Sequence, residues 1–364
     1  MKIGILTFHC AHNYGAVLQC YALQEVLKGI GCEVEVINYR SDYLVNPYKW
    51  FDINRFIPKI SFKAVKNNIK EIILLRTRYK RYKAFENFIN HKLNLSNKVT
   101  KDNIPSIYDT YILGSDQIWS SKITNGIDPV FCGNFPFKKG RKKYIAYAAS
   151  MEIKTLSSCE NEYYKKSLNK IDFISVREYQ LKALLQPLTG KKIETVLDPT
   201  ILADSSIWGK FLRPFKNGKK YVVKYQVRCD ENTSRIANEI ARQIDAEVIE
   251  VAACINYPLC KNNLQCASPE EFLSLIKYSS CVVTTSFHGT VFSVIFNRPF
   301  YCLYLNDNQD SRSMSFLKNI GLENRMVCKS DTPTFTEIDY GEINIRIAEL
   351  RNNSMNFLTD ALYH

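Results

Sequence analysis

A chain of 364 residues, 46% of them hydrophobic, is long enough for two packed domains of about 150 residues each, and is neither disordered nor fibrous. The formal net charge of +13, from 49 Lys and Arg against 36 Asp and Glu, favours polyanions, anionic lipid headgroups or phosphorylated substrates as partners. The 12 cysteines form no CxxC pair, and no apolar run has the length of a signal-peptide core or a membrane span. We therefore expect a reduced, cytoplasmic protein.

Short β-rich runs alternate with helical patterns in the first half of the chain. The opening segments predict a strand, a helix and a second strand at 2–8, 15–29 and 33–38. Further on, the pattern predicts a helix at 179–185 and strands at 110–113, 144–148, 173–176 and 193–197, until Asp-Pro-Thr at 198–200 interrupts it. Such alternation is typical of a parallel sheet.

A second series of the same kind follows. It predicts strands at 220–226, 247–251, 281–285 and 300–305 and helices at 232–244, 269–278, 289–296 and 313–320. Ser268, Pro269 and Glu271 supply the cap, the first-turn proline and the capping-box acid of one helix. We predict an α/β fold of two doubly wound parallel-sheet domains, 1–200 and 201–364, with a substrate cleft where the carboxyl ends of the sheets meet.

A basic helical insertion is predicted in the first domain at about residues 49–101. Five cations lie within 8 residues there, interleaved with aromatic side chains: Arg76, Arg78, Lys80, Arg81 and Lys83. No helix-turn-helix, zinc-finger or RNP-type signature accompanies them, so no nucleic-acid partner is expected. Such a helix can lie on an anionic membrane, which would place the protein peripherally at the inner face; the alternative is an ordinary solvated helix face.

Four polar loops follow predicted strands, where the carboxyl ends of a parallel sheet usually meet a ligand. They contain Asn13 and Gly15, then Gly114, Ser115 and Asp116, then Arg177 and Glu178, and finally His288. Each loop alone also has a structural interpretation, in which glycines make turns, Asp116 caps a helix and Arg177 pairs with an acid. None contains GxxxxGK[ST] or GxGxxG, which argues against an ATPase or a standard dinucleotide enzyme.

The loop around His288 is the most informative of the four. A β-branched strand at 281–285 ends there, and an apolar helix is predicted to begin at Gly289. The free amides and positive dipole end of a helix start attract anions, so a phosphate or carboxylate beside His288 is the expected ligand. In the alternative interpretation, His288 only caps the helix or fills a gap.

A metal site is a weaker hypothesis for this sequence. His9, Cys10 and His12 lie close together in the chain, but no fourth ligand is evident. We therefore predict no metal.

Together, these motifs resemble the polysaccharide pyruvyl transferase family. The similar strings occur in family order over nearly the whole chain: NYGAVLQCYALQ, ILGSDQIW, YAAS, ISVREYQ, VLDPT, TTSFHGTVFSVIFNRPF and DSRSMSFLKNIGL. The resemblance implies Rossmann-like domains in a GT-B-like arrangement. It also implies that phosphoenolpyruvate donates pyruvate, as a ketal, to two hydroxyls of a sugar in a cell-surface polysaccharide or its lipid-linked precursor. The scheme needs no metal and no cofactor besides this donor substrate.

Transfer from the family motifs assigns roles to individual residues. His288 matches the family histidine near the donor, and Arg177 matches its strand-end arginine. Better-known members have an arginine two places before this histidine, where this chain has Ser286, and Arg298, Arg312 or a lysine can substitute. His288 is then the candidate acid or phosphate clamp, and Asp116 the candidate base. The expected substrate-binding residues are Arg177, Ser286, Gly289, Thr290, Asn13, Gly15, Ser115 and Arg312.

Two other functions stay open on the sequence. One is a GT-B glycosyltransferase using a nucleotide sugar, whose diphosphate would occupy the same helix start. The other is a non-catalytic module that binds an anionic glycan through the basic stretch. An enzyme should lose turnover on His288→Ala, whereas a binding module should depend more on the lysines near residue 80.

Overall fold

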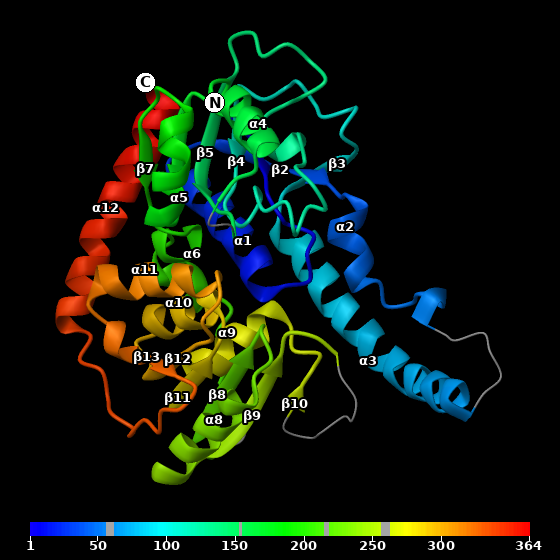
Figure 1. Ribbon diagram of the computed structural model, residues 1–364, viewed down its shortest axis with the longest axis vertical. Coiled ribbons are helices and arrows are strands. Elements are labelled where there is room, and N and C mark those ends of the chain that lie inside the picture. Colours follow the sequence, from blue (N-terminus) through cyan, green and yellow to red (C-terminus); the bar gives the residue numbers. More distant parts are fainter. Residues whose placement is uncertain (56–61, 153–154, 215–217, 256–262) are drawn as a thin grey trace.

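The computed structural model describes residues 1–55, 62–152, 155–214, 218–255 and 263–364, which form two α/β domains stacked along the long axis (Figure 1). The first domain contains β1 (Lys2–Leu6), α1 (Tyr14–Gly29), β2 (Glu33–Tyr39), α2 (Asp42–Val45), α3 (Phe62–Lys92), β3 (Leu95–Val99), β4 (Thr110–Leu113), β5 (Lys143–Ala149), α4 (Ser158–Leu168), β6 (Phe173–Val176), α5 (Tyr179–Leu185), β7 (Ile193–Thr195) and α6 (Pro199–Leu202).

The second domain contains α7 (Ser205–Gly209), β8 (Tyr221–Gln226), α8 (Glu231–Gln243), β9 (Glu247–Ala252), β10 (Asn263–Leu264), α9 (Pro269–Lys277), β11 (Cys281–Thr284), α10 (Phe287–Ile295), β12 (Phe300–Tyr304), α11 (Asp310–Ile320), β13 (Met326–Cys328) and α12 (Gly341–Tyr363). None of the helices in the described chain is long and apolar enough to cross a membrane.

Each domain is built on one sheet whose strand pairs are all parallel. The first sheet has the order β3-β2-β1-β4-β5-β6-β7, and the second has the order β10-β9-β8-β11-β12-β13. In both, the chain winds outward from the first strand in one direction and then in the other, as in Rossmann-like domains. The predicted fold class is confirmed.

The predicted elements differ from the structure mainly at their ends. The segment expected to interrupt the pattern at 198–200 instead begins the short helix α6, which Asp198 caps. Helix α10 begins at Phe287, before the predicted start at Gly289, because Ser286 caps it. The region of the predicted insertion also holds β3, the edge strand of the first sheet.

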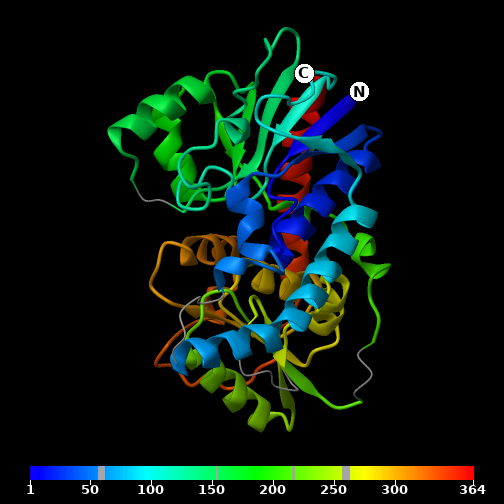
Figure 2. The ribbon, with the colours of Figure 1, turned by 90° about the vertical axis from the view of Figure 1, so that its right-hand side faces the viewer.

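Besides the short helices α2 and α7, two longer helices, α4 and α12, were not predicted. α4 begins with a capping box formed by Ser157 and Glu160. α12 runs from the second domain back along the first (Figure 2). There Ser354 accepts a hydrogen bond from the amide of Leu197 at 2.9 Å, so α12 ties both domains together.

One apolar core runs through both domains. Tyr14 of α1 stacks on Phe272 of α9, with 4.4 Å between ring centroids and 5° between ring planes. Its hydroxyl donates to the carbonyl oxygen of Ala267 at 2.8 Å, so the buried polar tip is also satisfied. Because α1 and α9 belong to different domains, these contacts fix how the two strand-end edges face each other.

Candidate functional site

A polar cavity of about 360 Å³ lies between the carboxyl edges of the two sheets. Side chains of both domains line it, among them Asn13, Asp116 and Gln117 of the first and Ser286, His288 and Arg312 of the second. A second cavity of about 640 Å³ adjoins it and shares Phe287 and Arg312. Polar loops that are far apart in the chain therefore converge on one site.

His288 lies in the first turn of α10, directly after the buried strand β11. The hydroxyl of Ser286 accepts from the amide of Gly289 at 3.3 Å and so caps the helix. The imidazole packs against α1 so closely that a Cβ on Gly15 would be 2.0 Å from Nδ1. Its Nε2 is buried and has no hydrogen-bond partner among the described residues. A buried ring nitrogen that makes no hydrogen bond within the protein is available to a ligand.

Three carboxylates surround Arg177 at the end of β6. Its Nη1 donates to Oδ2 of Asp198 at 2.6 Å, and Asp116 and Glu178 approach other guanidinium nitrogens to 3.5 and 3.7 Å. The guanidinium also lies over the ring of Phe287, 5.2 Å from its centroid. Its positive charge is therefore already compensated inside the protein, although Nε and Nη2 make no hydrogen bond to the described residues.

Asp198 is a central residue of the site that the sequence reasoning did not select. Its Oδ1 accepts from the amide and hydroxyl of Thr200 at 2.9 and 2.6 Å, and its Oδ2 lies 3.7 Å from Nε2 of His288. Burial alone would raise the pKa of this carboxyl, but His288, Arg177 and Thr200 together hold it well below its usual range. The sequence did contain a signal for a helix start at this residue, because Asp-Pro-Thr is typical of an N-cap residue followed by a first-turn proline.

Glu178 is the second buried carboxylate that was not assigned to the site. It is 2% exposed and accepts a hydrogen bond from the hydroxyl of Ser150 at 2.7 Å. Burial raises the pKa of Glu178 against the attraction of Arg177. This acid therefore holds a proton more readily than a surface glutamate does.

Arg312, near the start of α11, is the cation that faces both cavities. It has no carboxylate within 4.0 Å in the described part of the chain. With the amide oxygen of Gln117 turned toward it, both Nη atoms donate to that oxygen at 2.6 and 2.7 Å. Burial and the neighbouring Arg177 lower the pKa of Arg312. An incoming anion would relieve this unfavourable charge environment.

The first domain presents Asp116 and Asn13 to the cavity. Asp116 follows β4 with a φ of +80°, and its Oδ1 accepts from the amide of Gln117 at 2.8 Å. Gly114 has a φ of +121°, and a Cβ there would be 2.3 Å from the carbonyl oxygen of Tyr147. Glycine at position 114 is thus required for the turn that delivers Asp116 to the cavity. Asn13 reaches the cavity from a different element, as the N-cap of α1.

The remaining predicted residues lie behind the cavity. The hydroxyl of Ser115 is buried 3.3 Å from Asp198 Oδ2, and that of Thr290 donates to the carbonyl oxygen of Ser286 at 3.2 Å. A Cβ on Gly289 would be 2.4 Å from Oγ1 of Thr284. The structure does not bring the Ser115 and Thr290 hydroxyls or Gly289 to the cavity wall; they shape the loops that present Asp198 and His288.

The hypothetical metal cluster is not assembled. His9 Nε2 lies 3.1 Å from Oδ1 of Asn38, whereas His12 Nε2 lies 3.1 Å from Oε1 of Glu86. Burial lowers the pKa of His9 to about 4. Within the described ranges, no group of three or more His, Cys, Asp or Glu side chains is placed to hold a metal ion.

Two Rossmann-like domains that enclose a polar cavity at their strand ends define a two-domain α/β protein of GT-B-like architecture. The chain belongs to the polysaccharide pyruvyl transferase family, whose model matches residues 13–307.

Solved structures that the chain resembles include a putative UDP-N-acetylglucosamine 2-epimerase from Listeria monocytogenes, at 10% identity and a TM-score of 0.47, covering 99% of this chain and 90% of that one. Another is the UDP-GlcNAc 2-epimerase from Neisseria meningitidis bound to UDP-GlcNAc, at 10% identity and a TM-score of 0.45, covering 99% and 94%. A search of curated proteins found no match.

Proposed function

We propose that this protein transfers pyruvate from phosphoenolpyruvate to a sugar of a cell-surface polysaccharide, or of its lipid-linked precursor, as a ketal. The proposal rests on family membership and on one observation above all. Nε2 of His288 is buried without a hydrogen bond in a cavity that both domains line, and Arg312 lines the same cavity. A proton-transfer group whose Nε2 makes no hydrogen bond to the described residues, in the same cavity as a cation with no carboxylate of those residues within 4.0 Å, suits an anionic substrate that must be protonated.

The reaction sets four chemical requirements. A proton is added to the methylene carbon of the enol phosphate, which makes the adjacent carbon oxocarbenium-like. One sugar hydroxyl adds to that carbon and loses its proton to a base. The carbon–oxygen bond to phosphate breaks and phosphate leaves. The second hydroxyl then adds to the same carbon, loses its proton to the released phosphate and closes the ketal. An acid, a base, a clamp for phosphate and a binding site for the donor carboxylate are therefore needed.

The two sides of the cavity suit the two substrates. On the second-domain side, His288, Arg312 and the first-turn amides of α10 favour the anionic donor. On the first-domain side, Asp116 and Asn13 are acceptors suited to sugar hydroxyls, and Asp116 is the proposed base. Arg177 still has two nitrogens to donate, but its pairing with Asp198 makes Arg312 the better proposed partner for a donor oxyanion.

Two alternatives make different predictions for ligand binding. A nucleotide-sugar glycosyltransferase would place a diphosphate at the start of α10, and a glycan-binding module would use the basic surface of α3. A thermal-shift screen with phosphoenolpyruvate, nucleotide sugars and nucleotides distinguishes them, because a ligand that binds only the folded protein stabilises it by mass action. Stabilisation by nucleotide sugars but not by phosphoenolpyruvate would contradict the proposal.

Arg312→Gln is expected to weaken phosphoenolpyruvate binding by about 10- to 100-fold, since a hydrogen bond to a charged group contributes about 1.5–3 kcal/mol. The dissociation constant can be measured by calorimetry. Arg242→Gln is the matched control, because the Arg242 side chain is 72% exposed and is not among the residues that line the cavity. Equal affinities for both variants would remove Arg312 from the donor site.

Ser286→Arg restores the arginine found two places before the histidine in better-known family members. Ser286 lines the cavity, so the new guanidinium can reach the donor region, although the helix loses a cap that contributes about 1 kcal/mol. We expect phosphoenolpyruvate binding to be kept or tightened in calorimetry. A collapse of binding in a variant that still folds would mean that this cavity is built for a different donor.

A further inference from the structure

Exposed apolar side chains are concentrated in one part of the molecule. Of the 17 large hydrophobic residues exposed in the described chain, eight lie between positions 50 and 79. They are Trp50, Phe51, Ile53, Val65, Ile69, Ile72, Ile73 and Tyr79. Scattered exposed hydrophobic residues are ordinary, whereas a contiguous group marks an interaction surface.

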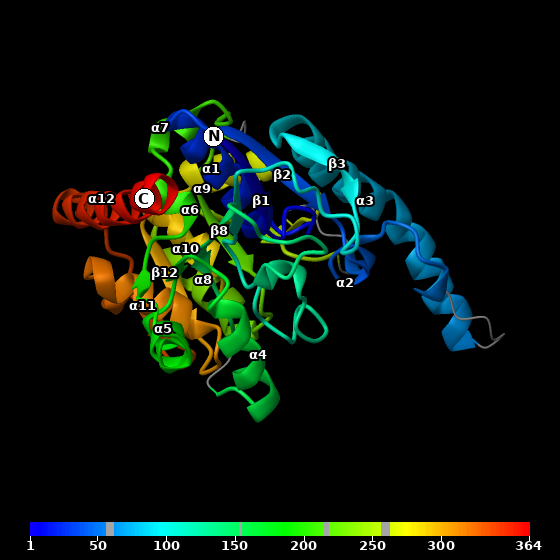
Figure 3. The same ribbon diagram turned by 90° about the horizontal axis from the view of Figure 1, so that it is seen from above.

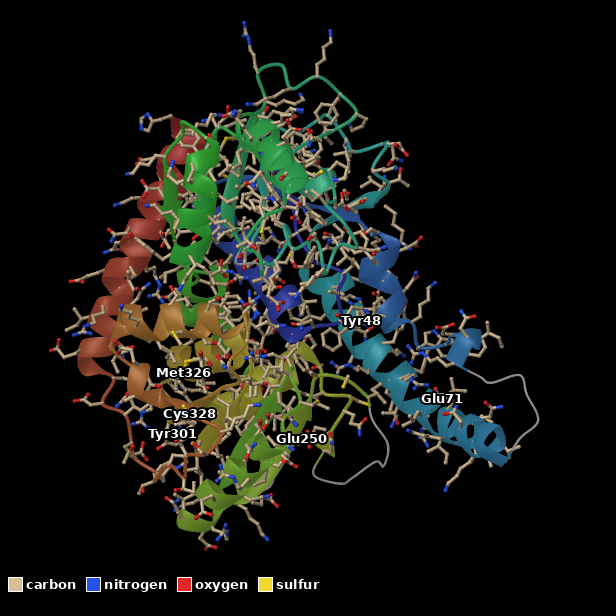
Figure 4. The ribbon with its side chains drawn as sticks, viewed as in Figure 1. Tyr48, Glu71, Glu250, Tyr301, Met326 and Cys328 are labelled. Atoms are coloured by element: carbon tan, nitrogen blue, oxygen red, sulfur yellow. The ribbon has the colours of Figure 1, made fainter. Side chains whose placement is uncertain are left out.

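These residues belong to a projecting arm, formed by residues 46–55 and residues 62–83 of α3. The helix leaves the body of the protein and carries Glu71 far from both sheets (Figures 3 and 4). Trp50 packs edge-to-face on Tyr79, with 5.3 Å between ring centroids, which joins the two segments of the arm. Most of the large apolar side chains in this part of α3 are exposed to solvent.

The apolar residues of α3 share a face with basic ones. At about 100° per residue, the positions 65, 69, 72, 73 and 79 fall on roughly one third of the helix circumference. Arg76, Lys80 and Lys83 lie on the same face and are exposed. An exposed face that combines large apolar side chains with cations is typical of a helix that lies in a membrane interface.

Arg81 attaches the base of the arm to the second domain. This guanidinium is 6% exposed and donates to the carbonyl oxygens of Ala252 at 2.9 Å, Ala253 at 2.9 Å and Gln265 at 3.0 Å. It also lies over the ring of Phe85. Of the five cations that the sequence suggested for membrane contact, Arg81 is thus buried, and Arg78 pairs with Glu71.

We propose that the arm docks on an anionic membrane surface, with its apolar side chains entering the interface and Arg76, Lys80 and Lys83 facing lipid phosphates. A second copy of the chain is a poorer occupant, because two such faces would bring like charges together. Nucleic acid is also poorer, because it offers no apolar interior for Ile69, Ile72 and Ile73. This docking goes beyond the proposed transfer reaction and does not depend on it.

Docking would bring the membrane close to the cavity. Tyr48, at the base of the arm, lines both the cavity that holds His288 and a neighbouring one of about 350 Å³ that also contains Arg78 and Arg81 (Figure 4). A lipid-linked substrate held by its tail would then reach the strand-end edges without leaving the bilayer.

Trp50 reports directly on this proposal. The chain has three tryptophans, and Trp119 and Trp208 are 2% and 0% exposed, whereas Trp50 is 39% exposed. Vesicles of phosphatidylcholine with about 30% phosphatidylglycerol should shift the emission to shorter wavelength as Trp50 enters the interface, and pure phosphatidylcholine should do so far less. The shift should vanish in Trp50→Phe.

Two sets of variants complete the test by vesicle co-sedimentation. Arg76→Gln/Lys80→Gln/Lys83→Gln should weaken binding by about 100-fold, from the typical contribution of a basic residue near anionic lipid. Ile72→Ser/Ile73→Ser should weaken co-sedimentation and abolish the Trp50 emission shift. Its matched control, Ile107→Ser/Ile345→Ser, removes two isoleucines elsewhere that are also exposed, and should bind as the wild type does.

Several results would overturn the proposal. These are an absence of binding to anionic vesicles at low salt, equal loss of binding in the Ile72/Ile73 and Ile107/Ile345 variants, or a dimer that dissociates on Ile72→Ser/Ile73→Ser in analytical ultracentrifugation. Circular dichroism spectra that match the wild type ensure that each variant retains its helices.

Discussion

Replacing Gly15 by alanine is expected to lower turnover by about 100-fold, because a displacement of a catalytic group by about 1 Å has that effect. The new Cβ would lie 2.0 Å from Nδ1 of His288, 2.5 Å from its Cγ and 2.6 Å from its Cε1, so the imidazole must move. Phosphate release from phosphoenolpyruvate in the presence of sugar acceptors measures the effect. His288→Ala should lose about 100- to 10,000-fold, the range typical of a general acid.

Two further variants separate this effect from a general loss of structure. Gly29→Ala is the matched control at the other end of α1, where a Cβ would meet nothing within 4 Å, and it should be fully active. Gly15→Ala/His288→Ala should be no worse than His288→Ala alone, because the ring that clashes is gone. Full activity of Gly15→Ala, or additive losses in the double variant, would contradict a catalytic position for this imidazole.

Replacing Asp198 by asparagine is expected to reduce the free energy of unfolding by about 3–5 kcal/mol, because it leaves the buried Arg177 without its closest countercharge. Asparagine keeps the shape of the side chain and the oxygen that caps α6, but it removes the charge and the Oδ2 acceptor that Arg177 uses. Urea unfolding of the ligand-free protein measures it. Asp204→Asn is the matched control, since Asp204 caps α7 in the same way but is exposed.

The loss in Asp198→Asn should also depend on pH. The neighbours of Asp198 hold its folded-state pKa below the value in the unfolded chain. The ionised carboxylate therefore stabilises the fold above about pH 4 and contributes less as the pH falls below that value. The difference between wild type and variant should narrow in acid, and a difference that widens there would contradict this assignment. A loss no larger than that of Asp204→Asn would also contradict it.

Local pattern was sufficient to predict most strands and the winding of both sheets. The β-branched runs before His288 and Arg177 end in polar loops, and in a parallel sheet such loops meet at one edge. Asp198 was missed because its sequence reads as an interruption of the pattern. α12 was also missed, although its buried residues Ile343, Ile347, Leu358 and Leu362 recur at helical spacing.

The sequence by itself determined the two doubly wound sheets and the loops that carry His288, Asp116 and Arg177, because hydrophobic period and turn residues act over short distances along the chain. Only the tertiary structure decided which charges compensate one another. Asp198 binds Arg177 while Arg312 has no carboxylate within 4.0 Å among the described residues, and Arg81 is buried while Arg76 is exposed. Ion pairing and burial depend on separations of a few ångströms between distant segments, which spacing along the chain does not encode.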